Sequence, residues 1–190
     1  MKIKSVSVFS HELQVVNGPY VYSGGTLGAL RTCLVKITTD TGLVGWGEVC
    51  PLGPTYQPAH ALGALAALQE LAPHLIGVGV LPRVVSQAMD AALDGHNYAK
   101  AAIDIAIYDV LGKAANLPVH ALIGGALRAR IRSYYAISLL GPEDTARIVQ
   151  EKQREGYRAL QIKIGSGDVR KDAAVLRAAW GVLDAGVTLA

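Results

Sequence analysis

Gln161 and Lys163 are two polar residues that could take part in a reaction. They lie in residues 160–165 (LQIKIG), where apolar and polar residues alternate. In a strand, this alternation places both polar side chains on the face opposite the leucine and isoleucines. A lysine among partly desolvated groups has a lowered pKa, so its amine can accept a proton near neutral pH. The segment therefore offers a candidate general base. The alternative is a lysine that simply extends into solvent at the end of a strand.

Tyrosines occur in two stretches that show no helical or strand period. Residues 17–25 (NGPYVYSGG) contain Tyr20 and Tyr22, and residues 50–58 (CPLGPTYQP) contain Tyr56. Polar stretches rich in glycine and proline are typical of surface loops. An aromatic ring can hold a cationic nitrogen by cation–π attraction, worth about 0.5–2 kcal/mol. On these residues alone, ordinary loop packing would explain Tyr20 and Tyr22.

Other residue types that often mark sites show no such spacing. The two cysteines, Cys33 and Cys50, form neither a disulfide framework nor a zinc motif, and the five histidines are scattered. No metal ligands are therefore predicted among these residues. Residues 165–167 (GSG) follow the candidate strand and could hold an anion, but so short a turn is a weak phosphate signal.

Composition indicates a folded chain with a sizeable core. Of the 190 residues, 51% are hydrophobic and 17% are charged, and the mean hydropathy is +0.31. No apolar run reaches the ~18 residues that a membrane span needs, and the start lacks a signal peptide, so a cytoplasmic protein is expected. The net charge of +3 arises from basic residues interleaved with acidic ones, which gives little support for nucleic-acid binding.

The first part of the chain predicts an antiparallel meander followed by helices. Apolar residues alternate in three segments joined by polar or glycine-rich turns: residues 2–15, 31–39 and 43–48. Three alanine- and leucine-rich segments then place apolar residues at helical spacing: residues 59–76, 82–93 and 97–116.

In the second part of the chain, strand-like and helix-like segments alternate, which predicts parallel βαβ units. Strands are expected over residues 131–138 and 159–164, and residues 187–190 would begin a third strand. Helices are expected from Pro142 to Gly156 and over 168–185. A complete (β/α)8 barrel takes about 250 residues, so these units predict the N-terminal part of a longer protein. In a barrel, Lys163 would lie near the carboxyl end of its strand and point inward, where barrel enzymes assemble their active sites.

Three stretches carry a resemblance to a known family: residues 39–48 (TDTGLVGWGE), 99–124 (AKAAIDIAIYDVLGKAANLPVHALIG) and 161–165 (QIKIG). Together they resemble the mandelate racemase/muconate lactonizing enzyme group of the enolase superfamily over essentially the whole chain. The stretch 99–124 is long and specific, whereas the first stretch alone would not be. The sequence departs from the family at Gln161, where many members have a second lysine.

The resemblance implies a fold and a reaction. Residues 1–125 would form an α+β capping domain, a three-stranded antiparallel meander with helices. Residues 126–190 would form the first two and a half βα units of an incomplete (β/α)7β TIM-like barrel. The reaction would remove the proton α to the carboxylate of a small-molecule substrate, with Mg²⁺ stabilising the enediolate. The metal ligands would lie beyond residue 190, and the full-length enzyme would be a homo-oligomer.

Roles for the candidate residues follow from the same resemblance. Lys163 would be the base on one face of the substrate, and Gln161 would hydrogen-bond the substrate carboxylate or a metal-bound water. Without a second lysine, burial and the metal would have to lower the pKa of Lys163. Tyr20, Tyr22 and Tyr56 fall in the family's specificity loops, which close over the barrel, so the resemblance makes all three candidate substrate contacts.

Two further stretches, residues 53–68 and 95–106, resemble the branch acting on proline derivatives. The leading interpretation is therefore a racemase or epimerase acting at Cα of a proline betaine or related amino acid, with Tyr56 facing the quaternary ammonium. One alternative is a cis-3-hydroxyproline dehydratase, and another is a non-catalytic fragment or interaction module. The 190 residues alone are expected to be inactive.

Overall fold

The computed structural model describes residues 1–16, 18–22 and 24–190. Their contacts divide the chain into two compact units. One comprises Met1–Gln14 with Ala29–Leu127, and the other comprises Val15–Gly28 with Arg128–Ala190. The second unit therefore takes a short segment from the first part of the sequence. The domain boundary expected at 125/126 stays a prediction.

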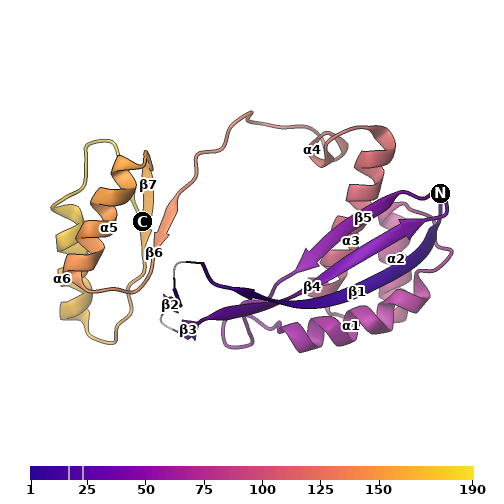
Figure 1. Ribbon diagram of the computed structural model, residues 1–190, viewed down its shortest axis with the longest axis horizontal. Coiled ribbons are helices and arrows are strands. Elements are labelled where there is room, and N and C mark those ends of the chain that lie inside the picture. Colours follow the sequence, from indigo (N-terminus) through magenta and orange to yellow (C-terminus); the bar gives the residue numbers. More distant parts are fainter. Residues whose placement is uncertain (17, 23) are drawn as a thin grey trace. The chain divides into compact units, whose positions relative to one another are not determined.

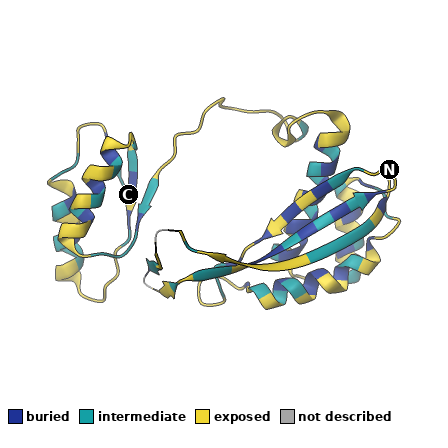
Figure 2. Cartoon of the chain, in the orientation of Figure 1, coloured by how far each residue is buried: buried dark blue, intermediate teal, exposed yellow. Residues whose placement is uncertain are grey.

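The first unit is built on an antiparallel sheet. Its strands are β1 (Ile3–Gln14), β4 (Ala29–Thr39) and β5 (Val44–Val49), in the order β1-β4-β5 (Figure 1). The tight turn between β4 and β5 includes Gly42 at φ +85°, a left-handed conformation that favours glycine. Buried and less buried residues alternate along β4 and β5 (Figure 2), as period two requires. The predicted meander is confirmed.

Helices cover the apolar face of this sheet and form one core with it. The helices are α1 (Ala61–His74), α2 (Pro82–Ala92), α3 (Asn97–Ala115) and the short α4 (Val119–Leu122). Cys33, Val35 and Ile37 of β4 share the core with helix residues such as Leu68 and Ile107, and all five side chains are fully buried. The three long helices begin and end within two residues of their predicted bounds.

Two glycines in β5 allow α3 to lie directly against the strand. A Cβ added to Gly47 would overlap the carbonyl oxygen of Ala102, and one added to Gly45 would overlap the carbonyl oxygen of Ala106. The backbones therefore approach more closely than any side chain permits. Asp109, also on α3, fixes the pairing by accepting a 2.8 Å hydrogen bond from the amide of Trp46.

The second unit contains the predicted parallel βαβ arrangement. Its elements are β6 (Tyr135–Ile137), α5 (Pro142–Arg154), β7 (Ala159–Ile162), α6 (Val169–Trp180) and β8 (Thr188–Leu189), and the sheet order is β6-β7-β8. The buried core joins Ile137, Leu160 and Ile162 of the strands to Val149 of α5 and Val175 of α6.

Two of these elements are shorter than the sequence predicts, for different reasons. The strand expected at 131 begins only at Tyr135, because residues 128–134 are exposed and pair with no neighbouring strand. The helix expected to reach residue 185 ends at Trp180, because the following backbone bonds to the buried amide of Gln153. That amide donates to the Val182 carbonyl at 3.0 Å and accepts from the Asp184 amide at 2.7 Å.

A small hairpin in the glycine-rich stretch was not predicted. Strands β2 (Tyr20–Tyr22) and β3 (Gly25–Leu27) pair antiparallel, and the Val15 amide donates to the Gly28 carbonyl at 3.0 Å. Three-residue strands are too short to show a period in the sequence. Asn17 and Ser23 of this stretch lie outside the described residues.

The loop between β7 and α6 is closed by a carboxylate of the chain itself. Asp172 accepts hydrogen bonds from the amides of Gly165 and Ser166, both at 3.1 Å, and Asp168 caps α6 by accepting from the Arg170 amide at 2.9 Å. The Ser166 side chain, followed by the two amides, lowers the pKa of Asp172. The amides that could have held a bound anion therefore hold Asp172.

Gly47→Ala should destabilise the protein by about 1–3 kcal/mol, because the added methyl group forces α3 away from β5. Denaturant unfolding at constant pH measures the change. Gly79→Ala is the control, since nothing lies within 4 Å of a Cβ at that position. Equal stability of the two variants would contradict the close-approach argument.

Asp172→Asn should lower the melting temperature at pH 7 but have less effect at pH 3. The folded-state pKa of Asp172 is lowered, so its contribution to stability is present above the unfolded pKa of about 3.9 and is lost as pH falls through the folded value. Thermal melts at both pH values test this. Asp144→Asn controls for loss of an exposed carboxylate in a first helical turn. An equal effect of Asp172→Asn at both pH values would contradict the expectation.

Candidate functional site

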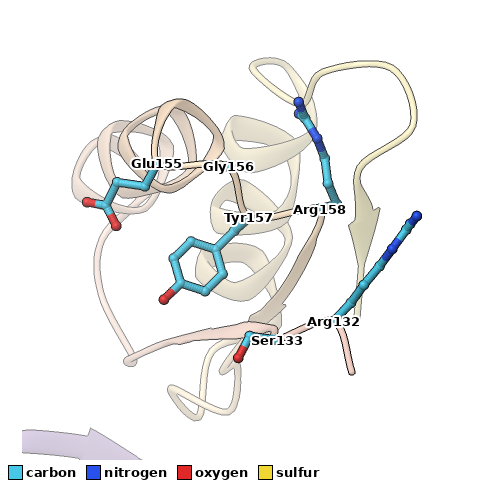
Figure 3. A pocket seen from close by; sticks show the side chains of 6 residues that line it. All are labelled: Arg132, Ser133, Glu155, Gly156, Tyr157 and Arg158. Carbon is cyan, nitrogen blue, oxygen red and sulfur yellow. The ribbon is translucent and has the colours of Figure 1, made fainter. Parts of the chain in front are cut away.

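Among the described residues of the second unit, one cavity lies near each end of the strands β6 and β7. The larger, about 580 Å³, is lined by residues that precede β6 and β7: Arg132, Ser133, Glu155, Gly156, Tyr157 and Arg158. Figure 3 shows both arginine side chains extending away from the Tyr157 ring, which packs edge-on against Tyr135 with centroids 5.5 Å apart. Parallel α/β folds bind ligands at the carboxyl ends of their strands, so this cavity is not the favoured site.

The other cavity, about 500 Å³, lies where β6 and β7 end. It is lined by apolar and polar residues from the loops after both strands and from α6: Leu139, Leu140, Gly141, Pro142, Lys163, Ser166, Lys171, Asp172, Ala174 and Val175. Lys163 is the sequence-predicted base. Lys171 and Asp172 were not singled out from the sequence, because an exposed charged pair in a first helical turn resembles any solvated helix start.

Pairing with β6 positions Lys163. Its amide donates to the Ile137 carbonyl at 3.2 Å, which continues the β6–β7 pairing one residue past the end of β7. Leu160 and Ile162 are buried in the core with α5 and α6, so the predicted alternation is confirmed through residue 162. It fails at Ile164, whose side chain is 47% exposed because the strand has already ended.

Two tyrosines from the β2–β3 hairpin lie beside the Lys163 amine. Its Nζ is 4.0 Å from the ring centroid of Tyr20 and 5.9 Å from that of Tyr22. The two rings stack with centroids 6.0 Å apart. The Lys163 side chain is half-buried, and this burial lowers its pKa. Three of the sequence-predicted residues therefore meet, and the pKa of the lysine shifts in the direction that a general base requires.

The surroundings of Gln161 and Tyr56 differ from those of Lys163 and from each other. Gln161 is exposed on β7 opposite Ala136 of β6, between the two residues that bury their side chains in the core. Tyr56 belongs to the other unit, in a turn between β5 and α1 where its amide donates to the Gly53 carbonyl at 3.1 Å. Its side chain is 62% exposed.

The described residues do not supply a metal site. Within residues 1–16, 18–22 and 24–190, no group of three or more histidine, cysteine, aspartate or glutamate side chains could hold a metal ion. His60, for example, accepts a hydrogen bond from the Gly63 amide and so caps α1. The residues present therefore do not fit Mg²⁺, and no reaction step is assigned to it. No helix in the described part of the chain is long and apolar enough to cross a membrane.

Comparison with curated proteins gives relatives of matching sequence but greater length. The cis-3-hydroxy-L-proline dehydratase of Roseibium aggregatum is 44% identical over 185 residues, which cover 96% of this chain and 50% of the relative. The N-succinyl-L-Arg/Lys racemase of Bacillus cereus is 32% identical over 184 residues, covering 92% and 48%. The chain thus spans about half the length of the curated relatives it matches.

Solved structures show the same fold across the chain. The N-succinyl Arg/Lys racemase of Bacillus cereus matches with a TM-score of 0.93 at 29% identity, covering 100% of this chain and 51% of that one. The dipeptide epimerase of Enterococcus faecalis, complexed with Mg and the dipeptide L-Leu-L-Tyr, matches with a TM-score of 0.92 at 29% identity, covering 100% and 52%.

A family model confirms the resemblance carried by the sequence motifs. The N-terminal domain of mandelate racemase / muconate lactonizing enzyme matches residues 4–124, the part of the chain that contains the meander and its helices. Together with the relatives above, this match shows that the chain belongs to the mandelate racemase/muconate lactonizing enzyme family of the enolase superfamily.

Proposed function

We propose that these residues belong to an enzyme that removes the proton α to a substrate carboxylate, with Lys163 as the base. The placement of the Lys163 amine carries this proposal. It is half-buried at the carboxyl end of β7, beside a cavity and two aromatic rings, and its pKa is lowered by burial. A lysine that merely extends into solvent would have neither the rings nor the lowered pKa.

The first step needs only a neutral amine. Lys163 takes the α-hydrogen as a proton, and the electron pair of the broken C–H bond is delocalised into the carboxylate as an enolate. In a dehydration, that pair then forms a Cα–Cβ double bond while the Cβ–O bond breaks, and the hydroxyl takes up one proton and departs as water. In an epimerisation, a second acid returns a proton to the opposite face of Cα.

Dehydration of a cis-3-hydroxyproline is the first candidate reaction. Its support is the dehydratase relative, 44% identical, against 32% for the racemase. The order of the two sequence-based interpretations is therefore reversed. Racemisation or epimerisation of an amino-acid derivative, including a proline betaine, is the second candidate, supported by the racemase and the dipeptide epimerase among the relatives.

The remaining candidates take supporting roles in this proposal. Gln161, exposed beside Lys163, would donate a hydrogen bond to the substrate carboxylate. The rings of Tyr20 and Tyr22 would border the substrate, and Tyr56 would contact its cationic nitrogen. Relatives solved with magnesium support Mg²⁺ in the full-length enzyme. Assembly as a homo-oligomer and a cytoplasmic location stay predictions.

Incubation in D₂O separates the two reactions. The full-length protein that carries this sequence is given cis-3-hydroxy-L-proline and, separately, a proline betaine, and the products are followed by NMR and mass spectrometry. Loss of water from the hydroxyproline is expected. Deuterium at Cα with the hydroxyl retained would instead identify an epimerase. If the folded protein gives no water loss and no deuteration with either compound, the non-catalytic alternative is favoured.

Lys163→Ala should reduce α-proton exchange by about 10²–10⁴-fold, the usual contribution of a general base, without unfolding the protein. The rate of deuterium incorporation measures the effect. Lys171→Ala is the matched control, because Lys171 lines the same cavity from α6 and has no part in the proposed step. Equal losses in both variants, or no loss at Lys163, would remove Lys163 from the mechanism.

A further inference from the structure

The Lys163 amine lies over the face of one ring in particular. Its Nζ is 4.0 Å from the Tyr20 centroid, well inside the ~6 Å range of cation–π attraction. Tyr22 is buried, and its ring stacks against Tyr20 at an interplanar angle of 24°. The Tyr20 ring is thus supported by Tyr22 and also contacts the ammonium.

The hairpin that carries Tyr20 is tied to the backbone that carries Lys163. Tyr20 pairs with Leu27 across the hairpin, and the Val21 carbonyl accepts a 3.3 Å hydrogen bond from the Leu139 amide. Leu139 follows β6, whose Ile137 carbonyl accepts from the Lys163 amide at 3.2 Å. Residues 137–139 therefore bind both the Lys163 backbone and the hairpin whose Tyr20 ring contacts the Lys163 side chain.

Two influences on the protonation of the Lys163 amine oppose each other. Burial disfavours the ammonium form, whereas the negative face of the Tyr20 ring favours it. Lys171 and Asp172 line the same cavity. The Asp172 carboxylate is bound to the amides of Gly165 and Ser166.

We propose that Tyr20 is a positioning residue for Lys163: its ring face holds the resting ammonium at the carboxyl end of β7, in the place where loss of a proton makes the amine a base. Correct folding of the β2–β3 hairpin is then a condition for correct placement of the base. The catalytic part of this inference rests on the proposed function, because it takes Lys163 as the base. The contact between ring and ammonium does not.

The decisive comparison keeps the shape of the ring and changes its electrostatics. Tyr20 is replaced in the full-length protein by phenylalanine and, through an unnatural amino acid, by 3,4,5-trifluorophenylalanine, whose fluorines weaken the negative ring face. The pKa of Lys163 is measured from its side-chain ¹³Cε shift, assigned with Lys163→Gln. The pH profile of α-proton exchange is recorded in parallel.

Phenylalanine should leave the Lys163 pKa close to that of the parent protein, and this variant is the reference for the exchange rates of the other two. Trifluorophenylalanine should lower the pKa by about half a unit or more and move the acidic limb of the pH profile by the same amount. At pH values above that limb it should lower kcat more than it raises KM, because the amine is held less firmly. Tyr20→Leu should act like trifluorophenylalanine and lower kcat further, about tenfold, because the amine is also less well placed.

Each contrary result has one meaning. An unchanged Lys163 pKa in the trifluorophenylalanine and leucine variants would overturn the positioning role. Equal exchange rates in the phenylalanine, trifluorophenylalanine and leucine variants would also overturn it and assign any loss relative to the parent protein to the Tyr20 hydroxyl. A shifted pKa together with normal exchange by Lys163→Ala would leave the contact standing and refute the proposed base.

Discussion

The pairing of β7 with β6 is the constraint on which the candidate site depends. Side chains on a strand alternate between faces, so burial of Leu160 and Ile162 against the helices fixes the opposite direction for their polar neighbours. A shift of the pairing by one residue would move the Lys163 side chain toward the apolar core, where an unpaired ammonium is costly. The same leucine and isoleucine that stabilise the second unit therefore orient its candidate base.

Elements with a clear hydrophobic period could be predicted from the sequence. Very short strands, and features that depend on contacts between distant residues, could not. The meander, the helices and the direction of Lys163 follow from alternation and helical spacing. The β2–β3 hairpin does not, because three-residue strands leave no period. The end of α6 also escaped prediction, since it depends on Gln153, which lies far away in the sequence. The contact between Tyr20 and Lys163 requires the folded chain, because 142 residues lie between the two in the sequence.

The two candidate reactions share their first step and differ only afterwards. Placing an amine beside the α-carbon serves both, so the geometry around Lys163 supports the family's common chemistry more strongly than either product. Choice between the products depends on the fate of the enolate, which is decided by groups on the substrate and on the opposite face. Two independent observations therefore support the proposal. Sequence similarity to the dehydratase supports the substrate, and the geometry around Lys163 supports the removal of the α-proton.

The hydrogen bond between Val15 and Gly28 brings the two ends of the hairpin segment together. Residues 15–28 therefore form a closed segment whose two ends lie side by side. Because β1 and β4 pair as far as Gln14 and Ala29, we expect substitutions inside this segment to leave that pairing in place. Such substitutions would alter the surroundings of the Lys163 amine, while the strand that carries the amine stays as it is.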